Sequence, residues 1–212
     1  MRKLLQLVAW IAGGLVLIGV ILRLTLFESW TIPDDPWLAA SLEPTLGAGD
    51  TVLVLVRGAA AFGDLVRCPD PEDPNRFVVG RIVGVAGDNV ELTGRTLLVN
   101  GRPYNASEAC VERTVHVKHP ETGHEMEIEC SRVEFAGGWH FRGVLPNPNN
   151  REDVKKEVGE GNVFLMSDNR DLHDDSRDFG TLPHANCNQR IVFRLWGPEG
   201  WSDSVRRMTV IR

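Results

Sequence analysis

The sequence predicts a mainly β fold of antiparallel sheets, preceded by one amino-terminal transmembrane helix. Three observations support this prediction: the chain opens on a long uncharged run, the remainder contains short stretches rich in Val, Ile and Phe, and turn residues separate those stretches. A length of 212 residues suggests one domain with a small extension. Apolar residues make up 42% and charged residues 25%, a composition that excludes widespread disorder.

The uncharged run extends over nineteen residues, from Leu4 to Leu22. At 1.5 Å per residue, a helix of this length spans the roughly 30 Å of a bilayer's hydrocarbon core. The alternative is a cleavable signal peptide, whose apolar core is usually about 7–15 residues long. This run is longer, and no small-x-small cleavage site follows it closely, because Leu38-Ala39-Ala40 matches poorly and lies too far away. We therefore expect an uncleaved anchor.

Charges on either side of the run predict its orientation. Arg2 and Lys3 precede it, and Glu28, Asp34 and Asp35 follow it. The positive-inside rule places the amino terminus in the cytoplasm. Residues 1–26 are then the cytoplasmic tip and membrane anchor, and residues 27–212 form a domain on the outer, periplasmic or extracellular, face.

The net charge of -6 is unevenly distributed and argues against nucleic acid as a partner. Residues 1–26 contain three basic side chains and no acidic one, which leaves 20 basic against 29 acidic side chains in the remainder. Nucleic-acid-binding domains usually show the opposite balance. Lysine is scarce: the chain contains only Lys3, Lys118, Lys155 and Lys156.

The predicted topology places the four cysteines in an oxidising compartment, where an even number favours disulfides. Four cysteines allow three pairings. The segment from Cys110 to Cys130 is predicted to form a hairpin around the turn 119–124, with Val117 opposite Met126 and Val115 opposite Ile128. A Cys110–Cys130 bridge is compatible with this register only if the strand bends near Cys110.

Zinc is an alternative at this hairpin, because His116, His119 and His124 lie near Cys110 and Cys130. Their spacing matches no closed zinc site. We therefore expect a polar hairpin and no metal.

Turn residues such as Gly87-Asp88-Asn89 and Asn100-Gly101 separate the predicted strands. These strands are Thr51–Val56, Phe77–Val85, Val90–Leu92, Thr96–Val99, Asn162–Met166, Arg190–Trp196 and Met208–Ile211. No sustained helical period occurs after the anchor. The hairpin belongs to an insertion at about residues 103–158, which ends in the linker-like segment Gly143–Asn150.

Three short blocks contain the residues with chemical potential. The first is Ser41–Leu46 followed by Gly49-Asp50, the second is Gly63–Val66 with Val79–Asp88, and the third is Ser167–Gly180. A serine before a proline turn is often only a local cap. The third block is polar and follows an apolar strand, so its Asp, Asn and Arg side chains can form a rigid hydrogen-bonded scaffold.

In their order along the chain, these blocks resemble type I signal peptidases, which are membrane-anchored serine endopeptidases. The family shows Ser-Met-x-Pro-Thr-Leu, then Lys-Arg-Val-Val-Gly-x-x-Gly-Asp, then Gly-Asp-Asn-Arg-x-x-Ser-x-Asp-Ser-Arg-x-x-Gly. The resemblance covers residues 41–196 outside the Cys110–Cys130 segment. Matching positions are Ser41, Pro44, Thr45 and Leu46; Arg81, Val83, Gly84, Gly87 and Asp88; and Asp168, Asn169, Arg170, Asp175, Ser176, Arg177 and Gly180.

The resemblance implies that Ser41 is the nucleophile, but the family's general base is missing. In the family a lysine deprotonates the serine, and alignment places that lysine at Gly80. The neighbouring Arg81 is no substitute, because a guanidinium does not deprotonate near neutral pH. Ala39 replaces a serine that supplies an oxyanion hydroxyl in some members, which leaves the backbone N–H of Ser41 as the expected donor. Ile32-Pro33 lies nine residues before Ser41, so the entry to the nucleophile is longer than usual.

Two residues of the third block also depart from the family pattern. Ser167 replaces a glycine, and His173 replaces a serine that lies beside the lysine in the family. An imidazole ordinarily titrates near 6.5 and needs no large pKa shift to act as a base. We hypothesise a relocated arrangement of Ser41, His173 and Asp175, in which Asp175, or less favourably Asp171 or Asp174, orients the ring. The weaker base alternatives are His116, His140 and His184, and the opposing interpretation is an exposed His173 beside a dead site.

The resemblance thus implies a signal peptidase that cuts exported precursors after small residues at positions −1 and −3, through an acyl-enzyme. Its expected partners are signal peptides and membrane lipid, and no metal or organic cofactor is implied. The alternative is a catalytically silent homologue that binds exported segments or a membrane partner. A lysine deliberately replaced at Gly80 is a third explanation of the missing base.

Overall fold

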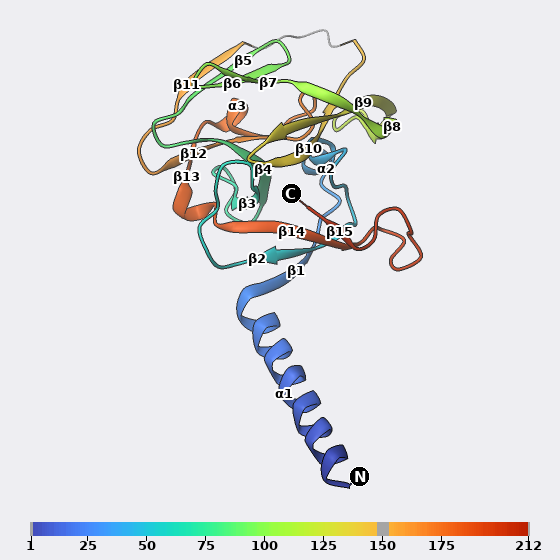
Figure 1. The fold of residues 1–212 in the computed structure, drawn as a ribbon. Helices are drawn as coiled ribbons and strands as arrows, with labels where there is room; N and C mark the ends of the chain where they lie inside the picture. The colour runs from blue at the N-terminus through green and yellow to red at the C-terminus, as the bar shows by residue number, and fades with distance from the viewer. Residues whose placement is uncertain (1, 148–152, 212) are drawn as a thin grey trace.

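The structure, a computed structural model, describes residues 2–147 and 153–211. Helix α1 (Arg2–Leu26) leads directly into strand β1 (Phe27–Thr31) and extends away from a β-rich body (Figure 1). Apolar side chains along α1, such as Trp10, Leu15 and Val16, are more than half exposed. Over the described residues, no helix combines the length and apolar character that a membrane crossing requires. The mainly β fold is confirmed, and the transmembrane helix stays a prediction.

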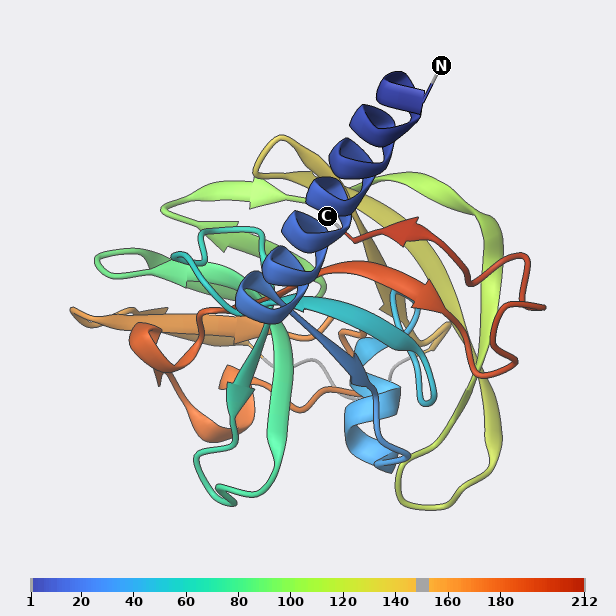
Figure 2. The same cartoon turned by 90° about the horizontal axis from the view of Figure 1, so that it is seen from below.

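The largest sheet is antiparallel and lies next to the base of α1, as the view from below shows (Figure 2). Its strands follow the order β1, β2 (Thr51–Leu55), β14 (Gln189–Trp196), β3 (Leu65–Pro69), β4 (Phe77–Val85), β12 (Asn162–Met166) and β13 (Leu182–Pro183), with β15 (Thr209–Val210) also paired to β14. Segments far apart in the sequence therefore become neighbours. In particular, β4 and β12 bring the second and third sequence blocks together.

Two smaller sheets complete the β structure. One has the order β11 (Val154–Glu157), β5 (Asn89–Thr93), β6 (Thr96–Val99) and β7 (Arg102–Tyr104), and the other has the order β10 (Gly138–Val144), β9 (Glu125–Phe135) and β8 (Ala106–Lys118). Short helices occupy the connections: α2 (Pro36–Leu42), α3 (Ser176–Phe179) and the 3-10 helix His184–Asn186. The predicted insertion at 103–158 thus contributes β8–β11, although residues 148–152 of its linker-like end lie outside the described residues.

The strand predictions from apolar patterning are confirmed, three of them with identical bounds (β4, β6 and β12). The strands that were not expected are β1, β3, β7, β10, β11 and β13. In β1 and β11, Glu and Lys side chains interrupt the apolar pattern. The short helix α2 also escaped notice, because seven residues are too few to display a helical period.

The β8–β9 hairpin has the predicted register, with Val117 opposite Met126 and Val115 opposite Ile128. The required bend near Cys110 is a wide bulge: Ala109 pairs with Ser131 and Thr114 with Glu129, so that residues 110–113 face Cys130 alone. Such a bulge lets the strand curve while pairing resumes on both sides.

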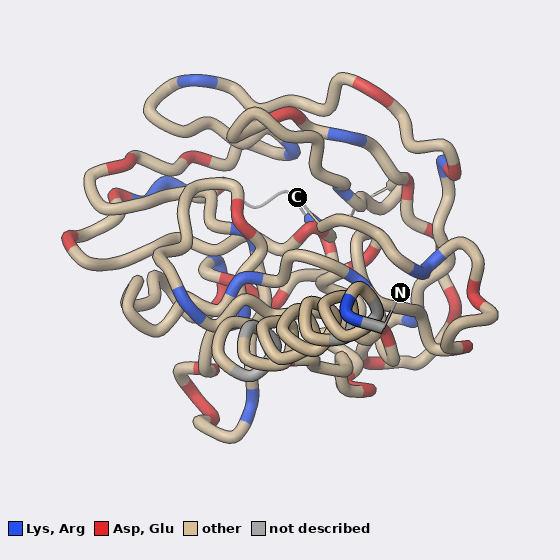
Figure 3. Tube along the Cα trace, turned by 60° about the horizontal axis from the view of Figure 1, so that its bottom comes forward, with Lys and Arg blue, Asp and Glu red and all other residues tan. Residues whose placement is uncertain are grey.

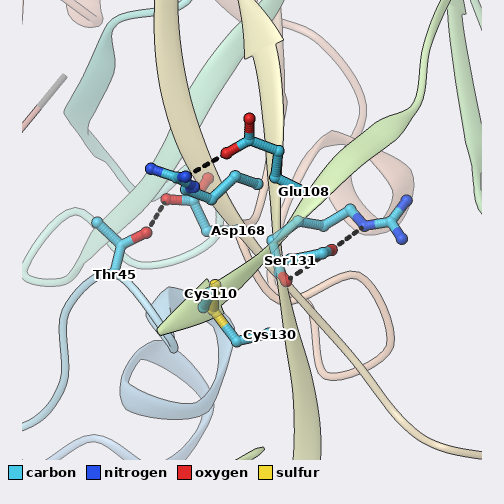
Figure 4. Close-up of a disulfide and its surroundings, with 8 residues drawn as sticks. Thr45, Glu108, Cys110, Cys130, Ser131 and Asp168 are labelled. Atoms are coloured by element: carbon cyan, nitrogen blue, oxygen red, sulfur yellow. Dashed lines mark hydrogen bonds and ion pairs between the residues drawn. A yellow bond between two sulfur atoms is a disulfide. The ribbon is translucent and has the colours of Figure 1, made fainter. Parts of the chain in front are cut away.

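Both pairs of cysteines form disulfides, Cys110–Cys130 across the bulge and Cys68–Cys187 between β3 and the segment before β14. The Cys110–Cys130 prediction is confirmed (Figure 4). The cysteines that the zinc alternative needed are therefore bonded to each other.

The core that positions α2 is built from the apolar residues of several elements. Leu38 and Leu42 on one side of α2 pack with Leu46 and Val79. Ala40, on another side, packs with residues of the insertion and with Leu172 of the third block. Helix α2 is therefore enclosed between the large sheet and the insertion.

Gly143 joins the insertion to the third block. Its N–H donates to Asp168 O at 2.9 Å, and its carbonyl accepts from Arg170 N at 2.8 Å. A Cβ at this position would lie 2.8 Å from Ile128 Cδ1 and 3.0 Å from the carbonyl oxygen of Glu43. Only glycine fits this approach without displacement of backbone.

The two disulfides are expected to contribute unequally to stability. Cys68–Cys187 closes a separation of 119 residues and Cys110–Cys130 one of 20, so loop-closure entropy predicts losses of about 5 and about 3 kcal/mol in the free energy of unfolding when each is removed. Urea unfolding of the C68A/C187A and C110A/C130A double variants measures the two losses. An equal or larger loss for the hairpin bridge would contradict this ranking.

Candidate active site

Ser41 lies in the last turn of α2, which begins after Asp35. The Asp35 carboxylate caps the helix by accepting a hydrogen bond from Leu38 N at 2.9 Å, and Pro36 occupies the first turn, where its missing N–H costs nothing. Ser41 is fully buried, and its hydroxyl donates to Leu38 O at 2.9 Å. In this state the hydroxyl is bonded to its own helix.

Asn169 of the third block holds the carboxyl end of α2. Its side-chain amide donates to Ala40 O at 3.0 Å, and its backbone N–H donates to Ser41 O at 3.0 Å. The last carbonyls of a helix lack partners within the helix, so these two bonds satisfy groups that would otherwise be buried unpaired. The position of Ser41 is thereby fixed by a residue 128 positions later in the chain.

Hydrogen bonds join one residue from each sequence block: Thr45 from the first, Arg81 from the second and Asp168 from the third. Arg81 donates from Nε and Nη2 to the two oxygens of Asp168, at 2.9 and 2.8 Å, and Thr45 Oγ1 donates to the same carboxylate at 2.6 Å. Arg81 also donates to Gly63 O at 2.9 Å. Burial alone would raise the pKa of Asp168, but the Arg81 guanidinium and the Thr45 hydroxyl outweigh it and hold that pKa below its usual value. Asp168 is therefore a buried anion.

Asp175 and Arg177 form a second buried pair in the same block. Arg177 donates to both oxygens of Asp175 at 2.9 and 2.7 Å, and Ser167 N donates to Asp175 Oδ2 at 2.7 Å. Burial would raise the pKa of Asp175, but these donors lower it well below its usual value. Asp175 also begins α3 as its cap.

The remaining scaffold residues complete the same network. Arg170 donates to Ser167 O at 2.7 Å, Arg177 donates to Arg170 O at 2.7 Å, and Ser176 Oγ accepts from Leu165 N at 2.9 Å. Burial lowers the pKa of Arg170 to about 9, which still leaves a cation at neutral pH. The third block is thus a hydrogen-bonded scaffold, as its composition predicted.

His173 lies in the loop before α3 and is partly buried. Its Nδ1 is 2.8 Å from Asp178 Oδ2, whereas the carboxylate of Asp175 is bonded to Arg177 and Ser167. The ring thus contacts Asp178, a residue that the sequence analysis did not consider. The five-residue spacing between His173 and Asp178, which spans the cap of α3, was the sequence feature that could have indicated this contact. A catalytic role for His173 or Asp175 stays a prediction.

The same three residues are the described group best placed to hold a metal. The ligand atoms of His173, Asp175 and Asp178 lie within 4.8 Å of one another. Both oxygens of Asp175 already accept hydrogen bonds from Arg177, so a cation would compete with a buried guanidinium. An ion-paired network describes this group better than a metal site.

Gly80, at the position of the family lysine, lies in β4 opposite Val66 of β3. A Cβ on Gly80 would point toward the end of β12, 3.1 Å from Leu165 Cβ and 3.4 Å from Met166 O. A side chain at this position would therefore lie against the last residues of β12, just before Ser167. These neighbours would have to shift by a few tenths of an ångström to make room for it. Of the other base alternatives, His140 is buried and bonded to Phe135 O, and His184 is bonded to Ala60 O, whereas His116 lines the cavity beside α2.

Arg76, which sequence reasoning missed, joins the cap of α2 to the loop that contains His173. Its guanidinium contacts Asp35 at 3.2 Å, Asp70 at 3.3 Å and also Asp174. Burial raises the pKa of Asp174, against the opposing effect of Arg76. Nothing in the run Pro69–Arg76 distinguishes this arginine from an ordinary loop residue.

A cavity of about 300 Å³ lies beside α2, between this helix and the β8–β9 hairpin. Pro36, Ala39 and Ala40 line one side, and His116 and Lys118 line the other. Ala39 and Ala40 directly precede Ser41, but Ser41 itself is fully buried and does not line this cavity.

Glu43 lines the same cavity, and its raised pKa predicts that the folding stability of the chain changes with pH in an unusual direction. Burial raises the pKa of Glu43 from 4.5 to about 7, against the lowering effect of Arg206. The folded state therefore retains a proton that the unfolded state loses between pH 4.5 and 7, so folding stability falls as pH rises through this window, by roughly 3 kcal/mol. Urea unfolding at several pH values should show this slope in the native chain and not in Glu43→Gln. The matched control is Glu121→Gln on the exposed hairpin turn, and parallel curves for all three proteins would contradict the assignment.

Removal of Arg76 should destabilise the chain in a pH-dependent way. Arg76→Ala leaves Asp35, Asp70 and Asp174 facing one another without a cation, which is expected to cost about 1 kcal/mol at pH 7 after solvent screening. The cost should be smaller at pH 4 than at pH 7, because burial raises the pKa of Asp174 and loss of the Arg76 cation raises it further. Chemical unfolding at both pH values checks this, with exposed Arg57→Ala as the control. A pH-independent loss would mean that Arg76 acts through packing alone.

Comparison with known proteins agrees with this arrangement. Residues 4–196 match the family described as signal peptidase, peptidase S26. Signal peptidase IB of Staphylococcus aureus strain Mu50 is 26% identical over 199 residues, which cover 92% of this chain and 91% of the relative. Signal peptidase I of Pseudomonas fluorescens is 29% identical over 177 residues, which cover 76% of this chain and 58% of the relative. Because the match includes α2, β4 and the scaffold after β12, the chain belongs to the signal peptidase family, peptidase S26.

Proposed function

We propose that this chain is a membrane-bound serine endopeptidase that removes signal peptides from exported precursors, with Ser41 as the nucleophile. The observation that carries the proposal is the convergence of the three sequence blocks on α2. Asn169 binds the carbonyls of Ala40 and Ser41, and Asp168 connects Thr45 to Arg81. A scaffold this specific for one serine supports catalysis at that serine.

In the proposed reaction, Ser41 Oγ attacks the scissile carbonyl while its proton passes to the His173 imidazole. The resulting oxyanion accepts a hydrogen bond from the backbone N–H of Ser41. The C–N bond then breaks, the imidazole gives the proton to the departing amine, and water hydrolyses the acyl-enzyme. Before the attack, the hydroxyl must leave Leu38 O, to which it is bonded in the resting structure.

The ring of His173 requires a carboxylate to fix its orientation. Asp178 contacts Nδ1, so we now favour Asp178 for this role over the Asp175 of the sequence-based hypothesis. Asp175 then acts on the site by holding Ser167 and Arg177.

The proposal includes α1 as a single-pass anchor, with the amino terminus in the cytoplasm and the β-rich body outside. The nineteen uncharged residues Leu4–Leu22 support it, as does the scarcity of charge along α1 compared with the body (Figure 3). The two disulfides agree with an oxidising compartment. Membrane lipid and signal peptides are the partners that this placement predicts.

A catalytically silent homologue that binds exported segments is the second candidate. Two observations favour it: Gly80 offers no base, and the Ser41 hydroxyl donates to its own helix. In this case the scaffold preserves a peptide-binding surface beside α2 without hydrolysis.

Processing of a purified precursor by the detergent-solubilised chain separates the two candidates. Activity that falls to background in Ser41→Ala and by about 10²–10⁴-fold in His173→Ala is expected if His173 is the base. His124→Ala, an imidazole lost from the exposed hairpin turn, is the matched control and should retain full activity. Full activity in His173→Ala together with none in Ser41→Ala would remove His173 from the mechanism and leave Ser41 in place.

Gly80→Lys tests the silent alternative. If the native chain does not process the precursor but Gly80→Lys does, the site lacks only its base and the silent function is favoured. Gly80→Arg is the matched control, because it adds a similar side chain that cannot deprotonate. If the native chain is active and Gly80→Lys leaves that activity unchanged, the site does not lack a base at residue 80.

A further inference from the structure

The bulge in β8 borders a cavity whose lining contains three arginines. This cavity has a volume of about 590 Å³ and lies on the face formed by β8, β9 and β10. Arg95, Arg113 and Arg142 line it, together with hydroxyls that include Ser131. Figure 1 places this region at the far end of the body from α1.

The Cys110–Cys130 disulfide shapes the rim of this cavity. Residues 110–113 leave the ladder between Ala109 and Thr114, and Cys130 lines the cavity beside them. Figure 4 shows the disulfide between the strands that carry Glu108 and Ser131. The bulge therefore opens a hollow that a regular hairpin would close, and the bridge keeps it open.

Two of the arginines lie close to each other. Arg142 donates from Nη1 to the backbone carbonyl of Arg95 at 3.2 Å and from Nε to Ser131 Oγ at 3.2 Å. Burial and the like charge of Arg95 both lower the pKa of Arg142. Two adjacent guanidiniums that partly lose their hydration repel each other unless an anion lies between or beside them.

The nearby carboxylates compensate this charge only in part. Glu108 is ion-paired with Arg132, outside the trio. Asp171 lies 4.0 Å from Arg95 and already accepts from Leu145 N at 2.6 Å. Glu129 is the other acidic residue in the lining. Asp171 therefore offsets part of the charge of Arg95 and Arg142, and the three arginines face at most two carboxylates, Asp171 and Glu129, that are not paired with an arginine outside the cavity.

We propose that this cavity is a binding site for a phosphate-type oxyanion, held by the guanidinium groups of Arg95, Arg113 and Arg142 and by neighbouring hydroxyls. Guanidinium groups bind phosphate oxygens in pairs with directional hydrogen bonds. The distance from α1 favours phosphate in solution, free or as a soluble monoester, over the headgroup of a lipid in the anchoring membrane. The site is independent of the chemistry at Ser41.

Calorimetric titration of the full chain in detergent with inorganic phosphate tests the site. We expect saturable binding with a dissociation constant of about 1 mM or tighter. Arg113→Gln should weaken it at least tenfold, and Glu129→Gln, which removes the lining anion, should strengthen it several-fold. Arg102→Gln is the matched control, because Arg102 is an exposed arginine that stacks on Tyr104 outside the cavity.

Several outcomes would overturn the proposal. One is the absence of saturable phosphate binding, and another is an equal loss in Arg113→Gln and Arg102→Gln. Binding to phosphatidylglycerol vesicles that depends on Arg113, without binding of inorganic phosphate, would replace the soluble anion with a lipid. Unfolding curves of each variant exclude loss of fold as the cause, and Arg95→Gln provides a second variant if Arg113→Gln is unstable.

Discussion

The buried ion pair of Arg81 and Asp168 is the interaction on which the arrangement of the site depends. Both side chains are removed from water, and two charges pay for that removal only if their geometry and hydrogen bonds are nearly complete. Thr45 and Gly63 O supply the remaining bonds. Displacement of β4, of β12 or of the segment after α2 would leave a buried charge unpaired. The pair therefore fixes these three segments relative to one another, and Asn169, next to Asp168, fixes Ser41 in turn.

Much of this architecture was predictable from the sequence, because its determinants are local or periodic. Runs rich in Val, Ile and Phe between turn residues predicted the bounds of β4, β6 and β12, and the pairing of Val117 with Met126 predicted the hairpin register and the need for a bend at Cys110. The dense polar block after β12 predicted a hydrogen-bonded scaffold. Its composition did not indicate which carboxylate would pair with which arginine.

The remaining features depend on contacts between distant segments, for which the sequence offers no periodic signal. Arg76 lies in a loop and acquires its three carboxylate partners only when β3–β4, α2 and the third block come together. The contact of His173 with Asp178 depends on the cap of α3, a helix of four residues. The raised pKa of Glu43 likewise reflects burial, which no local pattern near Pro44 reveals. Long-range packing, more than local propensity, decides the electrostatics of this site.

The close approach at Gly143 limits how the chain can be shortened. Although β8–β10 form a sheet of their own, the end of β10 supplies both a donor and an acceptor to the backbone around Asn169. Excision of residues 103–158 as a removable module would therefore leave the main-chain groups of Asp168 and Arg170, on either side of Asn169, without these partners. A minimal version of this protein must retain that strand end, and variation in length is better accommodated at Glu121 and Thr122, the exposed residues of the hairpin turn that do not line the cavity beside α2.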